Sequence, residues 1–488
     1  MSSIEVLDKD RAGRIESHGT DYVNDTERRG KPRELFGVWA GSNVAYLYFV
    51  LGSLLIIFGL NVWEAIAVVL AGNLLWVGVG YLATSGPAAG SPSEVIARAF
   101  FGVNGNRIVA FISGWMVGVL YEAINLSVGA LAGFAFVQQF VGTAPAFVKI
   151  SIVVALAIAT FTISVFGHGT IIKLGPWFTW ILLTALIVLA WFVITHANFG
   201  YVPKGGGLSG GALWATAAAG FAIIASAPLS WPVGADYSRY LPRTTSAKSV
   251  AFWTAFGGFI PATGIAILGV LAATVVDMSN PETAIAGLVP SWFYVIFLLV
   301  IILGSVFNNA LTAYSTGLAL LAAGIPWRRS RTVIFDAVVA VGVTLYALFI
   351  SNFLDTLSGL LEVSITVLAP YMAIYAVDIY LRRNRYDGPG LQDMTRKSAH
   401  WHTGGFNLAG FIALLVGAVG SLMFVNTTFW VGPLASALGG ADLSVFVGGI
   451  LGGGIYAAAT ARKLRAHSDA ALHATVRPQP AGDGQVTL

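Results

Sequence analysis

The chain has 488 residues, of which 56% are hydrophobic and only 10% are charged. Soluble domains carry about 25% charged residues, so this composition excludes an ordinary soluble protein. Cysteine is absent, which excludes disulfides and thiolate metal sites. The net charge of +4 is small, and we expect no nucleic-acid partner. These features together predict an all-α polytopic membrane protein.

Both ends of the chain are polar. Residues 1–34 are mixed in charge and contain no charged segment followed by an apolar core and a cleavage site, so we expect no cleavable signal peptide. Residues 466–488 contain Pro and Gly among polar side chains. We predict that both stretches are disordered tails.

Twelve stretches satisfy the requirement of a spanning helix for about 20 mostly apolar residues. They are residues 36–59, 62–84, 107–139, 146–166, 171–196, 211–230, 249–276, 292–323, 331–350, 354–381, 406–426 and 443–461.

The distribution of basic residues predicts the orientation of these spans, because cytoplasmic loops collect Lys and Arg. With the N-terminus inside, all of the 27 basic residues except Lys149 and Lys204 fall on the cytoplasmic side. We therefore expect a multi-pass protein of the plasma membrane with both termini in the cytoplasm.

The loop Gly86–Gly102 mixes Gly, Pro and Ser with an amphipathic turn. This pattern is compatible with a short helix at the inner face of the membrane or with an ordinary turn between two spans.

Two predicted spans contain features that interrupt a helix. The first carries Gly, Ser and Asn within Trp39–Asn43, and the sixth carries Pro228 and Pro232 within Ala225–Tyr237. Broken helices are tolerated in membranes where they line a cavity, and paired breaks in two halves of a chain indicate a transport site. The residues alone are also compatible with a proline kink and an unrelated packing contact.

Several polar side chains lie within predicted spans, where ionisable groups are costly and are candidates for function. Glu122 is mid-span with no basic residue nearby in sequence, and Glu362 is a second candidate. A protonatable carboxyl suits a proton-coupled carrier, although a structural carboxyl has the same pattern. No nucleophile–base pair or metal-spaced histidine cluster is apparent, so we expect a transporter and not an enzyme.

Tyr121 and Asn125 are one helical turn apart and so share a face. An aromatic plane beside an amide suits a flat heterocycle, which can stack on the ring and bond the amide at its edge. Asn308 and Asn309 place two further amides in the eighth span. Packing between helices is the alternative for all four side chains.

Four stretches resemble the nucleobase:cation symporter-1 family, the purine–cytosine permeases. They are "SGPAAGSPSEVIARAFFGVNGN" (Ser85–Asn106), "ADYSRYLP" (Ala235–Pro242), "NNALTAYSTGL" (Asn308–Leu318) and "APYMAIYAVDIYLRRNRY" (Ala369–Tyr386). The resemblance implies a LeuT-like fold, with inverted five-helix repeats at residues 35–201 and 202–385 followed by two extra helices at residues 386–465. It also implies alternating access around a site at the membrane midplane.

The resemblance implies site residues position by position. It places the stacking aromatic on Tyr121 and its partner amide on Asn125, while an alternative register places the aromatic on Trp115. It places the second helix break near Ser226 and Ala227, where many members carry another aromatic; Trp231 is an alternative source of that ring. The remaining substrate-side positions that it implies are Asn43, Asn308, Asn309 and Thr312.

The cation site departs from the family pattern. Sodium-coupled relatives use carbonyls of the first helix, here those of Gly41 and Val44, with two hydroxyls of the eighth. Those hydroxyl positions fall on Val306 and Phe307, and Ser305 is one residue out of register. We therefore expect proton coupling through Glu122 in preference to sodium coupling, and no other cofactor.

The sequence thus predicts a monomeric symporter that imports a purine or pyrimidine base such as cytosine or adenine. One alternative is the same scaffold carrying allantoin, hydantoin, uracil, thiamine or another small heterocycle. A channel is the alternative from a different class.

Overall fold

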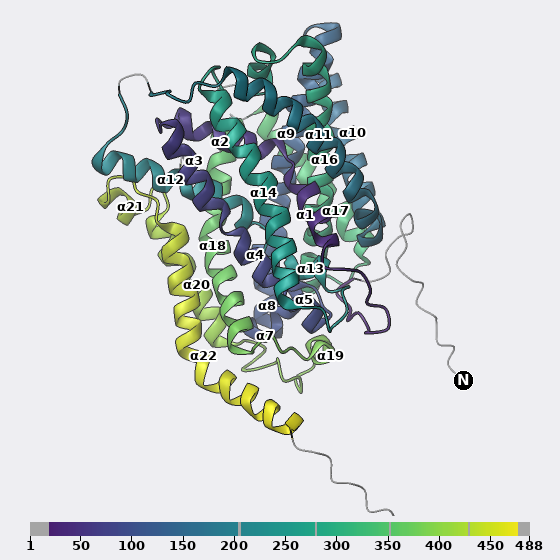
Figure 1. Cartoon of the computed structure of the whole chain (residues 1–488). Coiled ribbons are helices and arrows are strands. Elements are labelled where there is room, and N and C mark those ends of the chain that lie inside the picture. The colour runs from purple at the N-terminus through teal and green to yellow at the C-terminus, as the bar shows by residue number, and fades with distance from the viewer. Residues whose placement is uncertain (1–18, 204–205, 279–280, 351–352, 428–429, 477–488) are drawn as a thin grey trace, which may run out of the picture.

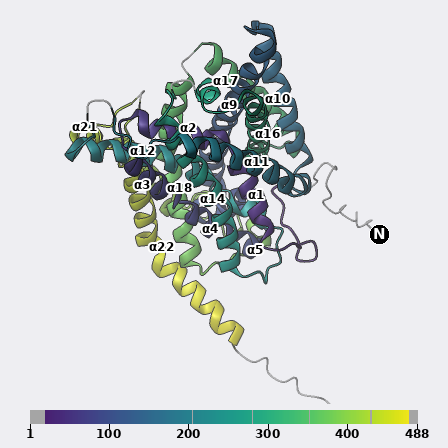
Figure 2. The ribbon, with the colours of Figure 1, turned by 45° about the horizontal axis from the view of Figure 1, so that its top comes forward.

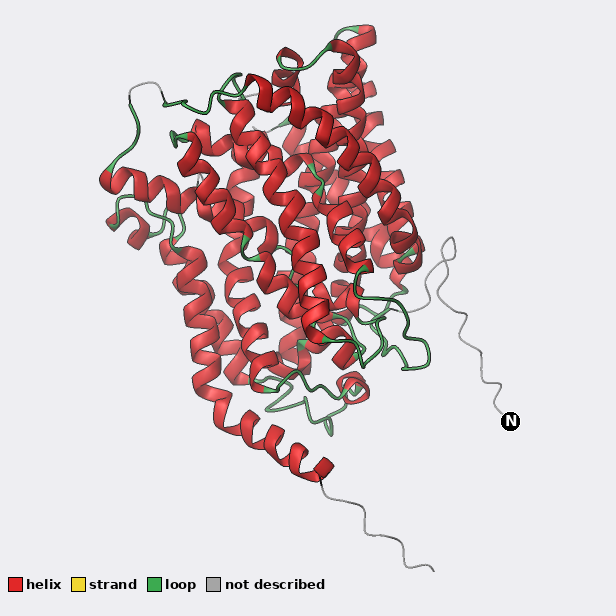
Figure 3. Cartoon of the chain, in the orientation of Figure 1, coloured by secondary structure: helices red, strands yellow, loops and turns green. Residues whose placement is uncertain are grey.

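The computed structural model describes residues 19–476 apart from 204–205, 279–280, 351–352 and 428–429, and helices dominate it (Figures 1 and 3). Among the described residues, ten helical stretches are long and apolar enough to cross a membrane. They comprise α3–α5 (Val62–Asn73, Trp76–Ala83, Ser85–Ala89), α8–η1–α9 (Val103–Val109, Ala110–Met116, Val117–Val141), α10 (Ala146–Phe166), α11 (His168–His196), α12–α13 (Gly210–Leu229, Gly234–Ser238), α14 (Ala247–Ala273), α16 (Ser291–Ala322), α17 (Arg329–Phe349), α18 (Phe353–Leu381) and α22 (Ser444–Val476).

Two further apolar segments complete the series. Helices α1 (Glu34–Asn43) and α2 (Tyr46–Ile57) meet at an angle of 54° and together form a broken span, and α20 (Leu408–Phe424) is a shorter helix of 17 residues. In chain order these segments fall at the predicted stretches, but only ten, or eleven with the broken pair, are long and apolar enough to span among the described residues. Helix α20 is shorter than the roughly 20 residues of a usual span, so the predicted number of twelve spans is not established.

The helices form two packed groups and a flanking layer. Helices α1–α4, α12 and α14 pack together, while α9, α10, α16 and α17 pack on one another around their own apolar cluster. Helices α18, α20 and α22 lie side by side along one flank, where α20 and α22 are yellow in Figures 1 and 2. The two groups meet along α1, α11 and α16, so both contribute residues to the region between them.

The crossing of α2 and α14 depends on small residues. A Cβ atom on Gly52 would lie 1.9 Å from the carbonyl oxygen of Ala266, and one on Gly269 would lie 1.9 Å from the carbonyl oxygen of Phe49. Because lipid offers little hydrophobic drive for helix association, such backbone contact is a main source of packing energy in a membrane.

The loop Gly86–Gly102 is helical in part, so the short helix of the first interpretation is present, while its place at the inner face stays a prediction. It contains α6 (Ser93–Ile96) and α7 (Arg98–Phe101), and both helices are buried. These helices lie at the lower end of the bundle in Figure 1, with α5, α13 and α19 (Gly388–Gln392). We call this the α6 end of the bundle; it is the end predicted to face the cytoplasm.

The two tails differ from the expected disorder. Residues 19–33 pack on the α6 end, where the Arg28 guanidinium donates to the carbonyl oxygens of Val23 (2.9 Å) and Pro87 (2.8 Å). Helix α22 extends to Val476 because residues 462–476 are rich in good helix formers such as Ala, Leu and Arg. Residues 1–18 and 477–488 lie outside the described part of the chain.

Candidate substrate site

A cavity lies where the two broken spans meet α9 and α16. Its empty space is about 870 Å³, including the part that is open to solvent. The lining residues are Ala45, Leu47, Tyr48, Glu94, Asn106, Ala110, Ser113, Gly114, Val117, Gly118, Tyr121, Asn125, Ala227, Ser230, Trp231, Pro232, Val233, Asn308, Thr312, Ser315, Thr316 and Tyr371. The cavity thus runs from the helix breaks to the α6 end.

The first break falls between α1 and α2, directly after the predicted segment. The Asn43 amide nitrogen donates to the carbonyl oxygen of Trp39 (2.7 Å), and its amide oxygen accepts a hydrogen bond from the Tyr48 hydroxyl. Asn43 is fully buried and does not line the cavity, whereas Tyr48 and Ala45 do. The structure therefore places Asn43 behind the wall, where it fixes the break, instead of in contact with a substrate.

The second break falls between α12 and α13, as Pro228 and Pro232 predict. Ala227 lines the cavity, but the Ser226 hydroxyl is turned away and donates to the carbonyl oxygen of Ile223 (2.6 Å). Trp231 lines the cavity from within the break, and its ring meets Trp39 edge-on with centroids 5.4 Å apart. Trp231 thus places an aromatic ring in the cavity wall at the second break.

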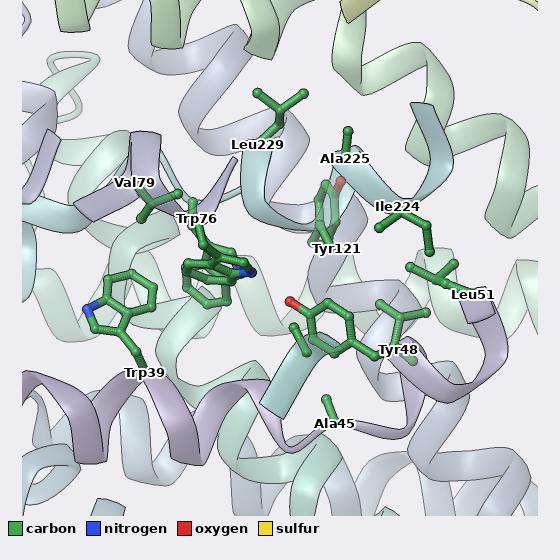
Figure 4. Close-up of a cluster of buried hydrophobic side chains, with 14 of the residues drawn as sticks. Trp39, Ala45, Tyr48, Leu51, Trp76, Val79, Tyr121, Ile224, Ala225 and Leu229 are labelled. Atoms are coloured by element: carbon green, nitrogen blue, oxygen red, sulfur yellow. The ribbon is translucent and has the colours of Figure 1, made fainter. Parts of the chain in front are cut away.

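Helix α9 presents Tyr121 and Asn125 to the cavity, as the predicted register requires. The Tyr121 hydroxyl donates to the carbonyl oxygen of Ser226 (3.0 Å), which ties the ring to the second break. Figure 4 shows Tyr121 and Tyr48 on the same side of the Trp76 ring. Within the described chain no hydrogen bond is found for the Asn125 amide, although it is 96% buried, so this amide is available to a ligand.

Trp115 does not occupy the aromatic position. Its indole nitrogen donates to Asp336 on α17 (2.6 Å), and its ring stacks between Phe111 and Phe335. Trp115 is absent from the cavity lining, so the structure does not place it beside the cavity as the alternative register would require.

Adjacent amides on α16 have different surroundings. Asn308 and Thr312 line the cavity, and the Asn308 amide nitrogen donates to the carbonyl oxygen of Ser42 at the first break (2.5 Å). Asn309 is fully buried outside the cavity, and its amide nitrogen donates to the carbonyl oxygen of Glu122 (3.1 Å). The structure places Asn309 between α9 and α16 and not at the predicted substrate contact.

The α6 end of the cavity is bordered by a feature that sequence reasoning missed. Residues Ala110–Met116 form the π-helix η1, a rare conformation that is frequent at functional sites. Ser113 and Gly114 of this segment line the cavity. A Cβ atom on Gly118 would lie 2.3 Å from the Thr316 hydroxyl oxygen, so glycine permits the close approach of α16.

Glu122 points away from the cavity into the group of α9, α16 and α17. It is fully buried, and among the described residues neither carboxyl oxygen has a hydrogen-bond partner. The neighbouring Thr316 hydroxyl donates instead to the carbonyl oxygen of Thr312 (2.9 Å). The charge of Glu122 interacts with that of Asp336, whose Oδ2 atom also has no partner in the described chain. Asp336 was missed, although it is an acidic residue inside the predicted span 331–350.

The other predicted carboxyl, Glu362, lies on α18 outside the cavity lining. Its charge interacts with that of Asp442, in the loop before α22.

The positions implied for a sodium site are packed with an aromatic ring. A Cβ atom on Gly41 would lie 2.8 Å from the Phe307 ring, which stacks on Phe178 with centroids 4.6 Å apart. The carbonyl oxygen of Val44 faces Gly304, and Ser305 packs against Gly129 of α9 instead of facing α1.

Comparison with known proteins identifies the family. Residues 22–448 match the model of the family described as permease for cytosine/purines, uracil, thiamine and allantoin. The putative purine-cytosine permease YxlA of Bacillus subtilis is 27% identical over 455 residues, which cover 89% of this chain and 93% of that protein. The vitamin B6 transporter TPN1 of Saccharomyces cerevisiae is 24% identical, with 91% of this chain and 86% of that protein covered.

Solved structures show the same fold. Mhp1, a nucleobase-cation-symport-1 family transporter, in a closed conformation with bromovinylhydantoin bound, has a TM-score of 0.71 at 18% identity, covering 92% of this chain and 95% of that one. Its inward-facing conformation has a TM-score of 0.70 at 16% identity, covering 96% of this chain and all of that one. The predicted LeuT-like architecture is thus confirmed. The chain belongs to the permease family for cytosine/purines, uracil, thiamine and allantoin, and it is a membrane transporter and not an enzyme.

Proposed function

We propose that this protein is a symporter that imports a purine or pyrimidine base, such as cytosine or adenine, by alternating access. The proposal rests on the Asn125 amide, which lies beside Tyr121 in the cavity and has no hydrogen bond within the described chain. Trp231 adds a second ring, and Asn308 and Thr312 add polar groups from α16. Stacking planes with amides at the edge are the groups that recognise a flat, nitrogen-rich heterocycle.

The relatives support a heterocyclic cargo without defining it. YxlA and the FCY2 protein of Saccharomyces cerevisiae are described as purine-cytosine permeases, whereas TPN1 is described as a vitamin B6 transporter. The test is uptake of labelled cytosine and adenine into cells that express the protein, in competition with uracil, allantoin, hydantoin, thiamine and pyridoxine. We expect an unlabelled purine or pyrimidine base to compete at the lowest concentration. If allantoin, thiamine or pyridoxine competed most strongly, that compound and not a nucleobase would be the cargo. Non-saturable uptake would indicate a channel.

Protons are the proposed coupling ion, and Glu122 is the proposed coupling residue. Phe307 fills the space beside Gly41, and Val306 and Phe307 offer no hydroxyl, so oxygen ligands for sodium are few. Glu122 is a buried carboxyl without a partner in the described chain, and binding of a proton removes the cost of its buried charge. A protonophore should abolish accumulation, whereas uptake that follows a sodium gradient and ignores the protonophore would contradict this coupling.

Membrane location and assembly follow the same proposal. The basic residues support a plasma-membrane protein with both termini in the cytoplasm, so the α6 end faces the cytoplasm and the cavity leads toward it. A monomer is the proposed working unit.

A further inference from the structure

A second pair of buried carboxyl groups lies at the α6 end of the cavity, apart from Glu122. Glu94 on α6 lines the cavity and is only 4% exposed, and Asp236 on α13 is fully buried. They belong to two of the stretches that carry the family resemblance, and neither is among the substrate-binding or coupling residues proposed above.

The carboxyl group of Glu94 has no hydrogen-bond donor. Neither of its oxygens has a partner in the part of the chain that the structure describes, although its backbone carbonyl accepts from the Asn106 amide (2.7 Å). Leaving a buried carboxylate without donors is costly, because each lost hydrogen bond leaves charge in a medium that solvates it poorly.

Asp236, in contrast, is held in place by donors. Its Oδ1 atom accepts from the backbone N–H of Ser93 (2.9 Å), and its Oδ2 atom accepts from the Ser315 hydroxyl (2.7 Å). The Ser93 hydroxyl also accepts from the backbone N–H of Ala235 (3.2 Å), so α13 holds Asp236 against the start of α6, where Glu94 is the next residue. Two carboxylates are both acceptors, so they can bond only if one of them carries a proton.

The arginine side chains near the Glu94–Asp236 pair donate hydrogen bonds to other groups, and in the described part of the chain they form no ion pair with either carboxyl group. The titratable and charged groups around Glu94 are Asp236, Tyr237 and Arg239 from α13 and the residue after it, Tyr371 and Tyr375 from α18, and Arg98 from α7. Arg239 directs its Nη atoms to the carbonyl oxygen of Gly19 (2.9 Å) and the hydroxyls of Tyr240 and Tyr314, and Arg98 donates to the carbonyl oxygen of Leu391 (2.8 Å). The segments α5 and α19 contain no ionisable side chain, and α16 contributes the neutral Ser315 and Thr316.

Burial, and after it the negative charge of Asp236, raise the pKa of Glu94 well above its usual range. The direction agrees with the geometry, because a neutral Glu94 can donate to Asp236 and a charged one cannot.

We propose that Glu94 and Asp236 form a proton-binding site at the α6 end of the substrate cavity, in which the two carboxyl groups share one proton. Binding changes the charge of the pair from −2 to −1 and creates one O–H···O bond between α6 and α13. Loss of the proton to the cavity leaves two adjacent negative charges, which repel each other across the contact between these helices. This site is distinct from Glu122, which faces the other side of α9.

The test is infrared difference spectroscopy of the full-length protein in lipid vesicles without substrate, as the pH is raised. A protonated carboxyl has a C=O band separate from the bands of a carboxylate. We expect one such band to disappear on titration of the wild type and to be missing from Glu94→Gln. In Asp236→Asn the band should shift in frequency and titrate at lower pH, because Glu94 stays buried but loses the neighbouring negative charge. It should persist in Asp21→Asn, which removes an exposed carboxyl at the same end of the molecule.

Two results would overturn the proposal. One is a band that persists in Glu94→Gln, or that is unchanged in frequency and titration in Asp236→Asn, with thermal unfolding showing that the variant is folded. The other is loss of the same band in Glu122→Gln, which would assign the proton to the other carboxyl. Because no substrate is present, neither result depends on whether the protein carries a nucleobase.

Discussion

The two sides of α9 differ in how their polar groups are used. On one side, Tyr121 and Asn125 line the cavity, and the Asn125 amide has no hydrogen bond in the described chain. On the other side, Glu122 is enclosed by α16 and α17, and its backbone carbonyl accepts from Asn309. We therefore propose different tasks for these neighbours in sequence: the first side binds the ligand, and the second holds a proton and joins helices.

Removal of the carboxylate on the enclosed side should have the largest effect. In Glu122→Gln we expect loss of proton-driven accumulation, because an amide cannot bind and release a proton at this position. The measurement is accumulation of labelled base in vesicles under an imposed pH gradient. Glu362→Gln, which removes a buried carboxyl outside the cavity lining, should still accumulate substrate. Accumulation by Glu122→Gln that a protonophore still abolishes would contradict the role of this side.

The cavity side is tested by a matched pair of amides. Asn125→Ala should weaken equilibrium binding of the base by about ten- to hundredfold, since loss of a buried hydrogen bond costs about 1–3 kcal/mol. Asn309→Ala removes a bond between α9 and α16, so it should lower the thermal stability and leave affinity nearly unchanged. Binding by Asn125→Ala that equals the wild type would show that the two sides have been assigned wrongly.

The role of the ring at position 121 can be separated from that of its hydroxyl. Tyr121→Leu should weaken binding by up to about tenfold, because aromatic stacking contributes about 0.5–1.5 kcal/mol beyond simple burial. Tyr121→Phe keeps the ring and loses only the bond to the Ser226 carbonyl, so its affinity should fall less. Equal losses in both variants would assign the effect to the hydroxyl and the helix break instead of the ring.

The smallest effect is expected far from both sides of α9. The Asn61 side chain caps α3 by accepting from the backbone N–H groups of Trp63 and Glu64 (both 3.0 Å). In return, the Glu64 carboxylate accepts from the backbone N–H of Asn61 (2.9 Å). Asn61→Ala should lower stability by about 1 kcal/mol, as seen when other helix caps are lost. Chemical unfolding of this variant should therefore show the lower stability, while its affinity for the substrate stays unchanged. A large loss of affinity would show that the effects above are not specific to α9.

Helix positions and breaks could be predicted because their causes are local. Apolar length defines a span, and the Pro228 and Pro232 pair interrupts a helix whatever its neighbours are. The side of a helix that meets the cavity is a tertiary property. Asn308 and Asn309 are adjacent and of the same residue type, so sequence does not distinguish them. The packing of α16 on α9 decides that Asn308 lines the cavity and that Asn309 bonds to Glu122.

The missed residues have the same explanation. The π-helix η1 depends on how this segment packs against α16, and no local pattern predicts it. The contact of Arg28 with the carbonyl oxygen of Pro87 joins segments 59 residues apart, so the order of residues 19–33 could not be read from their polar composition. Asp336 was accessible to sequence reasoning, since an acid within a predicted span is a candidate by the same argument as Glu122.

The most direct test of the account is an experimental structure with a bound nucleobase. We predict planar density stacked on the Tyr121 ring, with its edge within hydrogen-bonding distance of the Asn125 amide and with Trp231 on its far side. Density that lies elsewhere in the cavity, with the Asn125 amide unoccupied, would contradict the central claim that the cavity side of α9 recognises the substrate.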